Sequence, residues 1–318
     1  MKLGIDIGGT TTTVAVVDDG YRIVSKNCMA TQGERDSAAV VKDIADLAFK
    51  TVKDANLSMD DVSSVGIGSP GIVDKSTKSV LYSNNIKWKN VNLCDDISKH
   101  IANKRMYIDN DANCAILGEW VAGAARGYSS AVMVTIGTGI GGGIILNGKI
   151  HNGFNSAANV IGHMSIVSGG RMCTCGRRGC WEAYASATAL IRTADQVARV
   201  NPRSELSYVK ARDGELNGKN IFETARNGDR EATDIVNGFM FFIAEGITNI
   251  INILQPEIVV LGGGVSNEGE YLLDNITRQV RSDVFCKDIE LPKIKIAKLK
   301  NDAGIIGAAS LGVFDKSP

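Results

Sequence analysis

The sequence predicts an α/β fold in which one structural unit occurs twice. Apolar strand-like segments alternate with amphipathic helix-like segments along the 318 residues, as in layered α/β proteins. Residues 2–20 (KLGIDIGGTTTTVAVVDDG) have the pattern of a strand, a glycine turn and a second strand that ends at a glycine. Residues 131–148 (AVMVTIGTGIGGGIILNG) repeat that order, so we expect an internal duplication with one such hairpin in each half.

The remaining elements follow from local patterns. Residues 37–57 have helical periodicity, and residues 62–74 form an apolar strand that enters a Gly-Pro turn. In residues 105–127 a strand becomes a helix after Asp111. Helices are also expected at 180–199, 231–255 and 301–314, with a buried strand at 256–266 whose glycines open another helix.

Composition and charge exclude several classes of protein. The 35 basic and 35 acidic residues give a formal net charge of zero, so no overall field attracts nucleic acid or an anionic membrane. No apolar run approaches the ~20 residues of a membrane span, and residues 4–9 place glycines and an aspartate where a signal peptide has its apolar core. We therefore expect a cytoplasmic protein with no nucleic-acid or membrane partner, in which a disulfide framework is not favoured.

Glycine-rich segments predict phosphate binding. They include DIGGTTTT (6–13), GTGIGG (137–142) and LGGGVS (261–266), while the Walker and Rossmann fingerprints are missing. Backbone N–H groups in such turns can approach an anion closely because no Cβ intervenes, and Asp6 could hold Mg²⁺ through water. A single glycine turn is often only a bend in a strand. Several in order, across two similar halves, favour a nucleotide held between domains.

The segment IDNDAN (108–113) contains the candidate for acid–base chemistry. Asp111 lies where a strand becomes a helix, which exposes a side chain at the edge of a sheet. A hydroxyl that attacks a γ-phosphate must lose its proton, and an aspartate within hydrogen-bond reach can accept it. The same residue types are typical of helix caps, so Asp109 or Asp111 could equally cap the helix.

Eight segments then resemble a known family, in order and across nearly the whole chain. They are LGIDIGGTTTTVAVVD, GIGSPGIVD, NDANCAILGE, TIGTGIGGGIILNG, IGHMS, CTCGRRGCWEAYAS, IVVLGGGVS and AGIIGAASLG. Together they resemble the ROK family of bacterial sugar kinases, which includes glucokinases, N-acetylhexosamine kinases, fructokinases and DNA-binding repressors. The resemblance implies a duplicated actin-like (ribonuclease H-like) α/β fold with two domains around a nucleotide and sugar cleft.

The resemblance also suggests how the domains divide. We expect a small N-terminal domain of residues 1–112, to which a C-terminal helix of about 302–318 returns. A large domain of residues 113–301 follows, and it carries a zinc loop at 163–180.

A cluster of sulfur ligands lies in that loop. Three cysteines fall within the eight positions 173–180, and His163 lies upstream of them. A disulfide knot, a reactive thiol site and a metal site could each use such a cluster, but three cysteines with one histidine suit the four ligands of tetrahedral zinc. By the resemblance, His163, Cys173, Cys175 and Cys180 form the structural zinc site of the family. The second nitrogen of His163 can then face a sugar hydroxyl.

The family's binding residues carry over to matching positions of this chain. Implied sugar contacts are Gly71, Asn85, Asn110, Asp111, His163 and Glu182, with Asn85 in a segment (NNI) that departs from the family's Pro-Asn-Leu. Implied ATP contacts are Asp6, Gly8, Gly9, Thr10, Thr138, Gly139, Gly262, Gly263 and Gly264.

One position departs from the family in its chemistry. Relatives have Gly-Glu-Ile-Gly-His where this chain has NVIGH (159–163), so Val160 replaces a glutamate that contacts the sugar, and Asn159 replaces a glycine. A pocket without that carboxylate should bind the usual hexose less well. Val160 could instead point into the core beside the zinc loop.

These observations predict an ATP-dependent, Mg²⁺-requiring sugar kinase that acts on O6 of a hexose or hexose derivative, with Asp111 as general base. A homodimer is expected from the resemblance. The alternative is a sugar-sensing ROK protein without kinase activity. The repressors of the family carry a helix-turn-helix module before the kinase-like body, and here the first phosphate strand begins by residue 3, so we expect no DNA binding.

Overall fold

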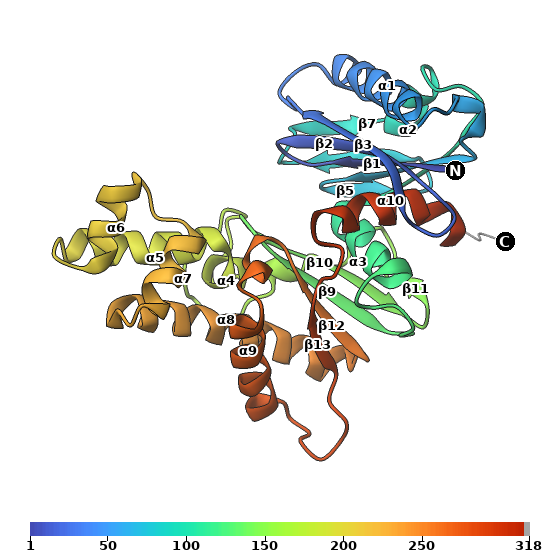
Figure 1. The fold of residues 1–318 in the computed structure, drawn as a ribbon. Helices are drawn as coiled ribbons and strands as arrows, with labels where there is room; N and C mark the ends of the chain where they lie inside the picture. The colour runs from blue at the N-terminus through green and yellow to red at the C-terminus, as the bar shows by residue number, and fades with distance from the viewer. Residues whose placement is uncertain (315–318) are drawn as a thin grey trace. The chain divides into compact units, whose positions relative to one another are not determined.

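The computed structural model describes residues 1–314, which form two compact units (Figure 1). The first unit contains Met1–Met133, Gly143–Asn159 and the C-terminal segment from Ala297. The second contains Val134–Gly142 and Val160–Ile296.

A mixed sheet of five strands organises the first unit. Its order is β3-β2-β1-β4-β8, with β1 (Lys2–Ile7), β2 (Thr11–Val17), β3 (Ile23–Ala30), β4 (Ser64–Ser69) and β8 (Arg105–Asn110). The hairpin strands pair antiparallel, whereas β1, β4 and β8 run parallel. Their register aligns Asp6 with Gly68 and Gly68 with Asp109. The carboxyl ends of three strands therefore meet at one edge of the sheet.

Helices cover both faces of this sheet (Figure 1). On one face α1 (Ser37–Asp54) packs its buried residues against Leu3, Ile5 and Ile7 of β1, with α2 (Leu93–Ser98) beside it. On the other face lie α3 (Asp111–Ala122) and α10 (Ala303–Phe314). A small antiparallel sheet of β5 (Ile72–Asp74), β6 (Ser79–Ser83) and β7 (Trp88–Val91) and the short η1 (Met59–Asp61) complete the unit.

Glycines let α10 approach the sheet and α3 at backbone distance. A Cβ on Gly66 of β4 would collide with the carbonyl oxygen of Ala308, and one on Gly4 of β1 with that of Ile305. Within the helix pair, a Cβ on Gly307 would collide with the carbonyl oxygen of Cys114. Any side chain at these positions would force the helix away from the sheet or from α3.

A buried carboxylate joins α3 to the segment that leads into α10. Glu119 is fully buried, and its oxygens accept hydrogen bonds from the backbone N–H groups of Leu299 (2.7 Å), Lys298 (3.1 Å) and Ala124 (2.6 Å). These donors satisfy a charge that would otherwise be costly to bury. The η4 turn (Lys300–Asp302) then leads directly into α10.

The second sheet repeats the order of the first. It runs β11-β10-β9-β12-β13, with β9 (Ala131–Ile136), β10 (Ile140–Leu146), β11 (Lys149–Ile150), β12 (Ile258–Gly262) and β13 (Lys293–Ile296), and β9 and β10 contribute residues to both units. As in the first sheet, the first two strands of the order pair antiparallel and the last two run parallel. The predicted duplication of a strand–turn–strand unit is confirmed.

Helices make up most of the second unit. They are α4 (Glu182–Ala185), α5 (Ala187–Val200), α6 (Glu205–Asp213), α7 (Gly218–Arg226), α8 (Arg230–Leu254) and α9 (Glu270–Asp283), with short turns η2 (Ile161–His163) and η3 (Gly264–Glu268). Among the described helices, α8 alone has the length and composition to cross a membrane, although no such run was expected from the sequence. More than half of its apolar window is buried within the unit, where α8 packs against α7 and α9 as a core helix.

The compact units differ from the predicted domain boundary at residue 112. Helix α3 belongs to the first unit because it packs along α10, so that unit continues to Met133. The predicted C-terminal helix of about 302–318 corresponds to Ala303–Phe314, and residues 315–318 lie outside the described part of the chain. The division of the domains at 112 and 301 stays a prediction.

Replacing Gly66 by alanine should lower stability, because the new methyl group meets the Ala308 carbonyl. We expect a loss of about 1–3 kcal/mol, typical of overpacking. Gly238 of α8 is the matched control, since nothing lies within 4 Å of a Cβ built there. Gly238→Ala should leave stability unchanged or raise it by up to about 1 kcal/mol. Thermal melts of both variants measure this, and equal shifts would contradict the backbone contact.

Candidate active site

Two carboxylates approach each other at the carboxyl edge of the first sheet. Asp6 lies near the end of β1, and Asp111 is the first residue of α3. Burial raises the pKa of Asp6 to about 7, and the negative charge of Asp111 adds to the rise. Burial also raises the pKa of Asp111, although the N–H of Ala112, 2.9 Å from its Oδ1, opposes this. The first turn of α10 borders the pair, since a Cβ on Gly304 would lie 2.6 Å from Oδ2 of Asp6.

Asn110, and not an aspartate, caps α3. Its side-chain oxygen accepts from the N–H groups of Ala112 (2.9 Å) and Asn113 (3.4 Å). Its side-chain nitrogen donates to the carbonyl of Gly71 at 3.0 Å, which brings two of the predicted sugar residues together. The cap is thus supplied by the residue before Asp111, while Oδ1 of Asp111 accepts a hydrogen bond from the N–H of Ala112. Asp111 was considered as a general base or as a helix cap, and the cap is supplied by Asn110.

The first glycine turn is built to expose its backbone. The N–H of Gly8 donates to the carbonyl of Thr11 at 2.9 Å, and the Thr31 hydroxyl donates to the carbonyl of Gly8 at 2.8 Å. Gly9 and Thr10 are exposed at the tip. A Cβ on Gly9 would lie 3.4 Å from Cβ of Asn85, so a predicted phosphate residue and a predicted sugar residue are neighbours.

The corresponding turn of the second unit is held by α5 and by Glu182. The carbonyl of Gly137 accepts from the N–H of Ala187 at 2.8 Å, and the carbonyl of Thr138 accepts from the hydroxyl of Thr188 at 2.7 Å. Oε2 of Glu182 accepts from the N–H of Ile140 at 2.9 Å and leaves no room for a Cβ on Gly139. Glu182, predicted to contact sugar, therefore lies against Gly139, predicted to contact phosphate.

The third glycine segment closes β12. Gly262 ends the strand, and Gly263 has a left-handed φ of 81° and packs against the backbone of Ile136. The expected helix does not begin at these glycines. Gly264 starts the short η3 turn, and α9 begins only at Glu270. Exposed Gly263 and Gly264 still leave backbone that a ligand could approach.

The four predicted metal ligands of the second unit come together. Among the described residues, His163, Cys173, Cys175 and Cys180 form a group whose ligand atoms all lie within 4.8 Å of one another. Sγ of Cys175 and Sγ of Cys180 are 3.6 Å apart, close to the ~3.8 Å edge of a tetrahedron with Zn–S bonds of about 2.3 Å. Nδ1 of His163 is the nitrogen that faces Sγ of Cys173, at 3.5 Å. The donor set and spacing are compatible with structural zinc.

The pKa values of two cysteines in this loop also favour a bound cation. The backbone N–H of Arg177 lowers the pKa of Cys175, which favours the thiolate that a metal binds. Burial raises the pKa of Cys180 to about 12, a cost that a bound cation would offset. Gly176 and Gly179 both have φ near 85°, so the loop turns where it wraps the cluster.

Val160 is 57% exposed, so it does not point into the core. It precedes the η2 turn, and its carbonyl accepts from the N–H of His163 at 3.1 Å. The preceding residue, Asn159, has a left-handed φ of 70°, which explains why a glycine is also suited to that position.

Sequence reasoning missed a group of polar side chains beside Asp111. In this group Asn113 contacts Asp109, Asn152 and Asn159 through their side chains. Asn113 and Asp109 belong to the segment IDNDAN that the sequence analysis singled out. Asn152 was not predicted to be part of a site, and Asn159 was noted only because it replaces a glycine of the family. The amide orientations depend on tertiary contacts that a linear pattern does not contain.

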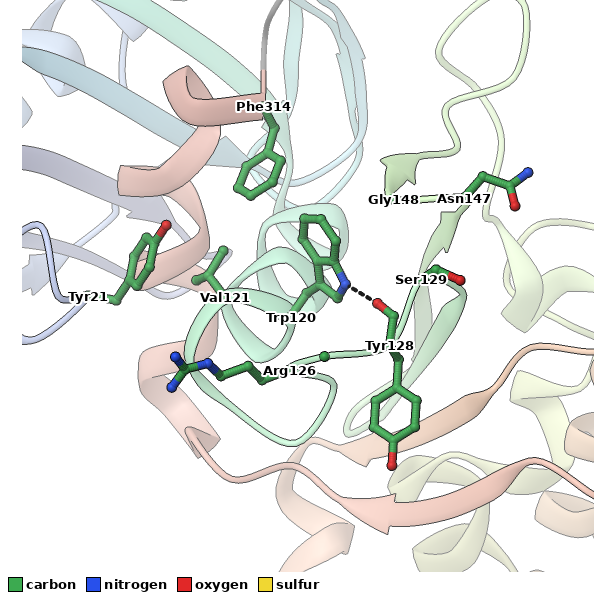
Figure 2. Close-up of a pocket in the computed structure, with 10 residues that line it drawn as sticks. Tyr21, Trp120, Val121, Arg126, Tyr128, Ser129, Asn147, Gly148 and Phe314 are labelled. Atoms are coloured by element: carbon green, nitrogen blue, oxygen red, sulfur yellow. Dashed lines mark hydrogen bonds between the residues drawn. The ribbon is translucent and has the colours of Figure 1, made fainter.

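An aromatic pocket of the first unit involves none of the predicted site residues (Figure 2). It has a volume of about 570 Å³ and is open to solvent. Trp120 lies at its centre, with its ring 4.9 Å from that of Phe314 and its N–H donating to the carbonyl of Tyr128 at 2.5 Å (Figure 2). Neither Asp6 nor Asp111 lines this pocket.

Comparison with known proteins connects these features. Residues 2–313 match the model of the ROK family. A glucokinase from Halalkalibacterium halodurans is 34% identical over 310 residues, which cover 97% of this chain and 94% of that protein. The xylose repressor of Caldicellulosiruptor bescii is 28% identical, over 98% of this chain and 78% of its own length.

The solved structures agree with the family match. The ROK family glucokinase from Streptomyces griseus in complex with glucose and AMPPNP has a TM-score of 0.83 at 35% identity, with 98% of each chain covered. The predicted fold class, a duplicated actin-like α/β fold, is confirmed by this likeness.

The raised pKa of Asp6 predicts how stability depends on pH. The folded state binds this proton more tightly than the unfolded state, where the pKa is near 3.8. Stability of the ligand-free protein should therefore fall as the pH rises from about 4 through 7. Asp6→Asn removes the titrating group. The Tm of the variant relative to that of the wild type should therefore increase as the pH rises from 5 to 8. Asp234→Asn, an exposed carboxylate of α8, is the control. Equal pH slopes for wild type and Asp6→Asn would contradict the raised pKa of Asp6.

Proposed function

Because the chain belongs to the ROK family and is an ATP-dependent sugar kinase, we propose that it phosphorylates O6 of a hexose or hexose derivative, with Asp111 as the general base. The observation that carries this proposal is the position of Asp111. It lies at the carboxyl edge of the sheet beside Asp6, while the neighbouring Asn110 supplies the helix cap.

Asp111 would accept the proton of the attacking hydroxyl. Its raised pKa supports this role, because a carboxylate with a higher proton affinity is a stronger base at neutral pH. Asp6 would act differently, by holding Mg²⁺ through water. Its buried carboxylate beside a second acid fits a cation, which would offset both causes of its raised pKa. Bound Mg²⁺ would supply positive charge to the phosphates of ATP.

The glycine turns would bind the nucleotide. Gly8, Gly9 and Thr10 offer an exposed turn in the first unit, and Thr138 with Gly139 offers one in the second. Gly262, Gly263 and Gly264 would border the adenosine. Backbone N–H groups and small residues allow this approach, and no lysine of a Walker motif is required.

By the family resemblance, the acceptor sugar would be bound by Gly71, Asn85, Asn110, Asp111, His163 and Glu182. The hydrogen bond between Asn110 and Gly71 supports their joint placement. Because Nδ1 of His163 faces the cysteines, its Nε2 is the nitrogen left for a hydroxyl. Exposed Val160 offers no acceptor, so binding of glucose should be weaker than with a carboxylate there.

We further propose that the cysteine cluster holds one structural zinc ion. Four protein ligands complete a tetrahedral shell and leave no open position for catalysis. The ion would instead fix the loop between His163 and Glu182, both predicted to contact the sugar. A cytoplasmic location, a homodimer and the lack of a nucleic-acid partner stay predictions.

The xylose repressor relative supports one alternative, a sugar-sensing protein without kinase activity. Both functions require sugar binding, but only the kinase requires a base and a nucleotide. Release of ADP in the presence of a panel of sugars separates them, and the same panel identifies the preferred substrate.

Asp111→Asn should lower kcat by about 10²–10⁴-fold with the best sugar of the panel. The amide keeps the size of the side chain but cannot accept a proton. Sugar affinity, measured by calorimetry, should change little. A variant that retains near wild-type kcat would show that Asp111 is not the base, and a wild type that binds sugar without releasing ADP would favour the sensor.

The purified protein should contain about one zinc ion per chain. Cys175→Ser should reduce the zinc content and weaken sugar binding more than ATP binding, because His163 and Glu182 flank the loop. Cys286→Ser, outside the cluster, is the matched control. Elemental analysis that finds no zinc in protein never exposed to chelator would contradict the site.

A further inference from the structure

A chain of hydrogen bonds fixes the amide orientations beside Asp111. The carboxylate of Asp109 can only accept, so the side-chain nitrogen of Asn113 must face it, at 2.9 Å from Oδ1. The same nitrogen donates its second hydrogen to Oδ1 of Asn152 at 2.7 Å. Lys75 forms an ion pair with the other oxygen of Asp109, Oδ2. Oδ1 of Asn113 therefore points to Asn159.

The orientation of Asn159 follows from these contacts. Its side-chain nitrogen donates to Oδ1 of Asn113 at 3.0 Å and to the backbone carbonyl of His151 at 2.5 Å. Both partners are acceptors, so the nitrogen cannot exchange places with the oxygen. Oδ1 of Asn159 is then a buried acceptor with no donor. Such a group normally obtains a hydrogen bond from water or from a ligand.

The position of this acceptor suits a sugar hydroxyl. Asn113 is in the first turn of α3, whose start carries Asn110 and Asp111, the residues we propose for sugar binding and proton transfer. The next residue in the chain, Val160, is exposed and apolar. Hydroxyl groups of a sugar that reaches Asp111 need acceptors, and Asn159 provides one that no protein donor occupies.

We propose that Oδ1 of Asn159 accepts a hydrogen bond from one hydroxyl of the acceptor sugar and so contributes to substrate specificity. This inference rests on the proposed sugar site. The acceptor is neutral, so it binds a hydroxyl less strongly than a carboxylate would, and it does not titrate. Asn113 acts as a positioning residue, since it orients Asn159 without contacting the sugar itself.

Asn159→Gly tests the proposal, because glycine keeps the left-handed φ of 70° while removing the acceptor. Calorimetry would measure binding of glucose, 1,5-anhydroglucitol, 2-deoxyglucose, 3-deoxyglucose and 4-deoxyglucose. The variant should bind glucose about fivefold more weakly, the effect of one hydrogen bond. One deoxy sugar, which already lacks the partner hydroxyl, should bind wild type and variant equally.

Ser156→Gly is the matched control. Ser156 is in the same loop and also has a left-handed φ, of 61°, so its replacement reproduces the backbone change alone. Its binding profile should equal that of the wild type. Binding of AMPPNP by Asn159→Gly should also stay close to wild type, whereas its Tm should fall because Asn113 and the carbonyl of His151 lose a donor.

Several outcomes would overturn the proposal. The first is unchanged binding of glucose in Asn159→Gly. The second is an equal loss of affinity for every deoxy sugar, which would indicate only a displaced loop. The third is a wild type that binds none of the five sugars. The selective pattern without release of ADP would leave this inference standing and refute the kinase assignment. Release of ADP without this selective pattern would support the kinase assignment and refute the role proposed for Asn159.

Discussion

The backbone contact between α10, the first sheet and α3 is the constraint on which the site depends. Glycines at 4, 66 and 307 allow helix and strand backbones to touch, and each would clash if it carried a Cβ. The close approach sets α10 beside Asp6 and α3 beside α10, so the two acidic groups share one buried edge. The electrostatic cost of that edge is visible in the pKa of Asp6, which rises to about 7. A cation is the natural partner of such a pair.

The two units have related topology but position their candidate binding residues in different ways. In the first, a sheet edge gathers carboxylates and amides, and hydrogen bonds through Asn110 and Asn113 orient them. In the second, a segment without a helix or strand links His163, at the end of η2, to Glu182, at the start of α4. A metal ion bound by the four clustered ligand atoms of this segment would tie its two ends together and so stabilise its geometry.

Much of this could be predicted from the sequence because its signals are local. Glycine turns, alternating elements and the Cys/His spacing each depend on neighbours in the chain, and the fold class followed from them. The capping of α3 by Asn110, the exposure of Val160 and the orphan oxygen of Asn159 depend on which distant groups meet. The assignment of α3 to the first unit likewise follows from its contact with α10, which no window around residue 112 contains.

The return of α10 to the first unit has a consequence for biosynthesis. A ribosome that has delivered all strands of the first sheet must still make the whole second unit before it reaches residues 303–314. During that interval the glycines of β1 and β4 lack the helix that packs on them in the finished protein, and the second unit can complete its own folding first. The nascent first unit should then be the part most dependent on chaperones, and pauses in translation after residue 262 would lengthen its exposure.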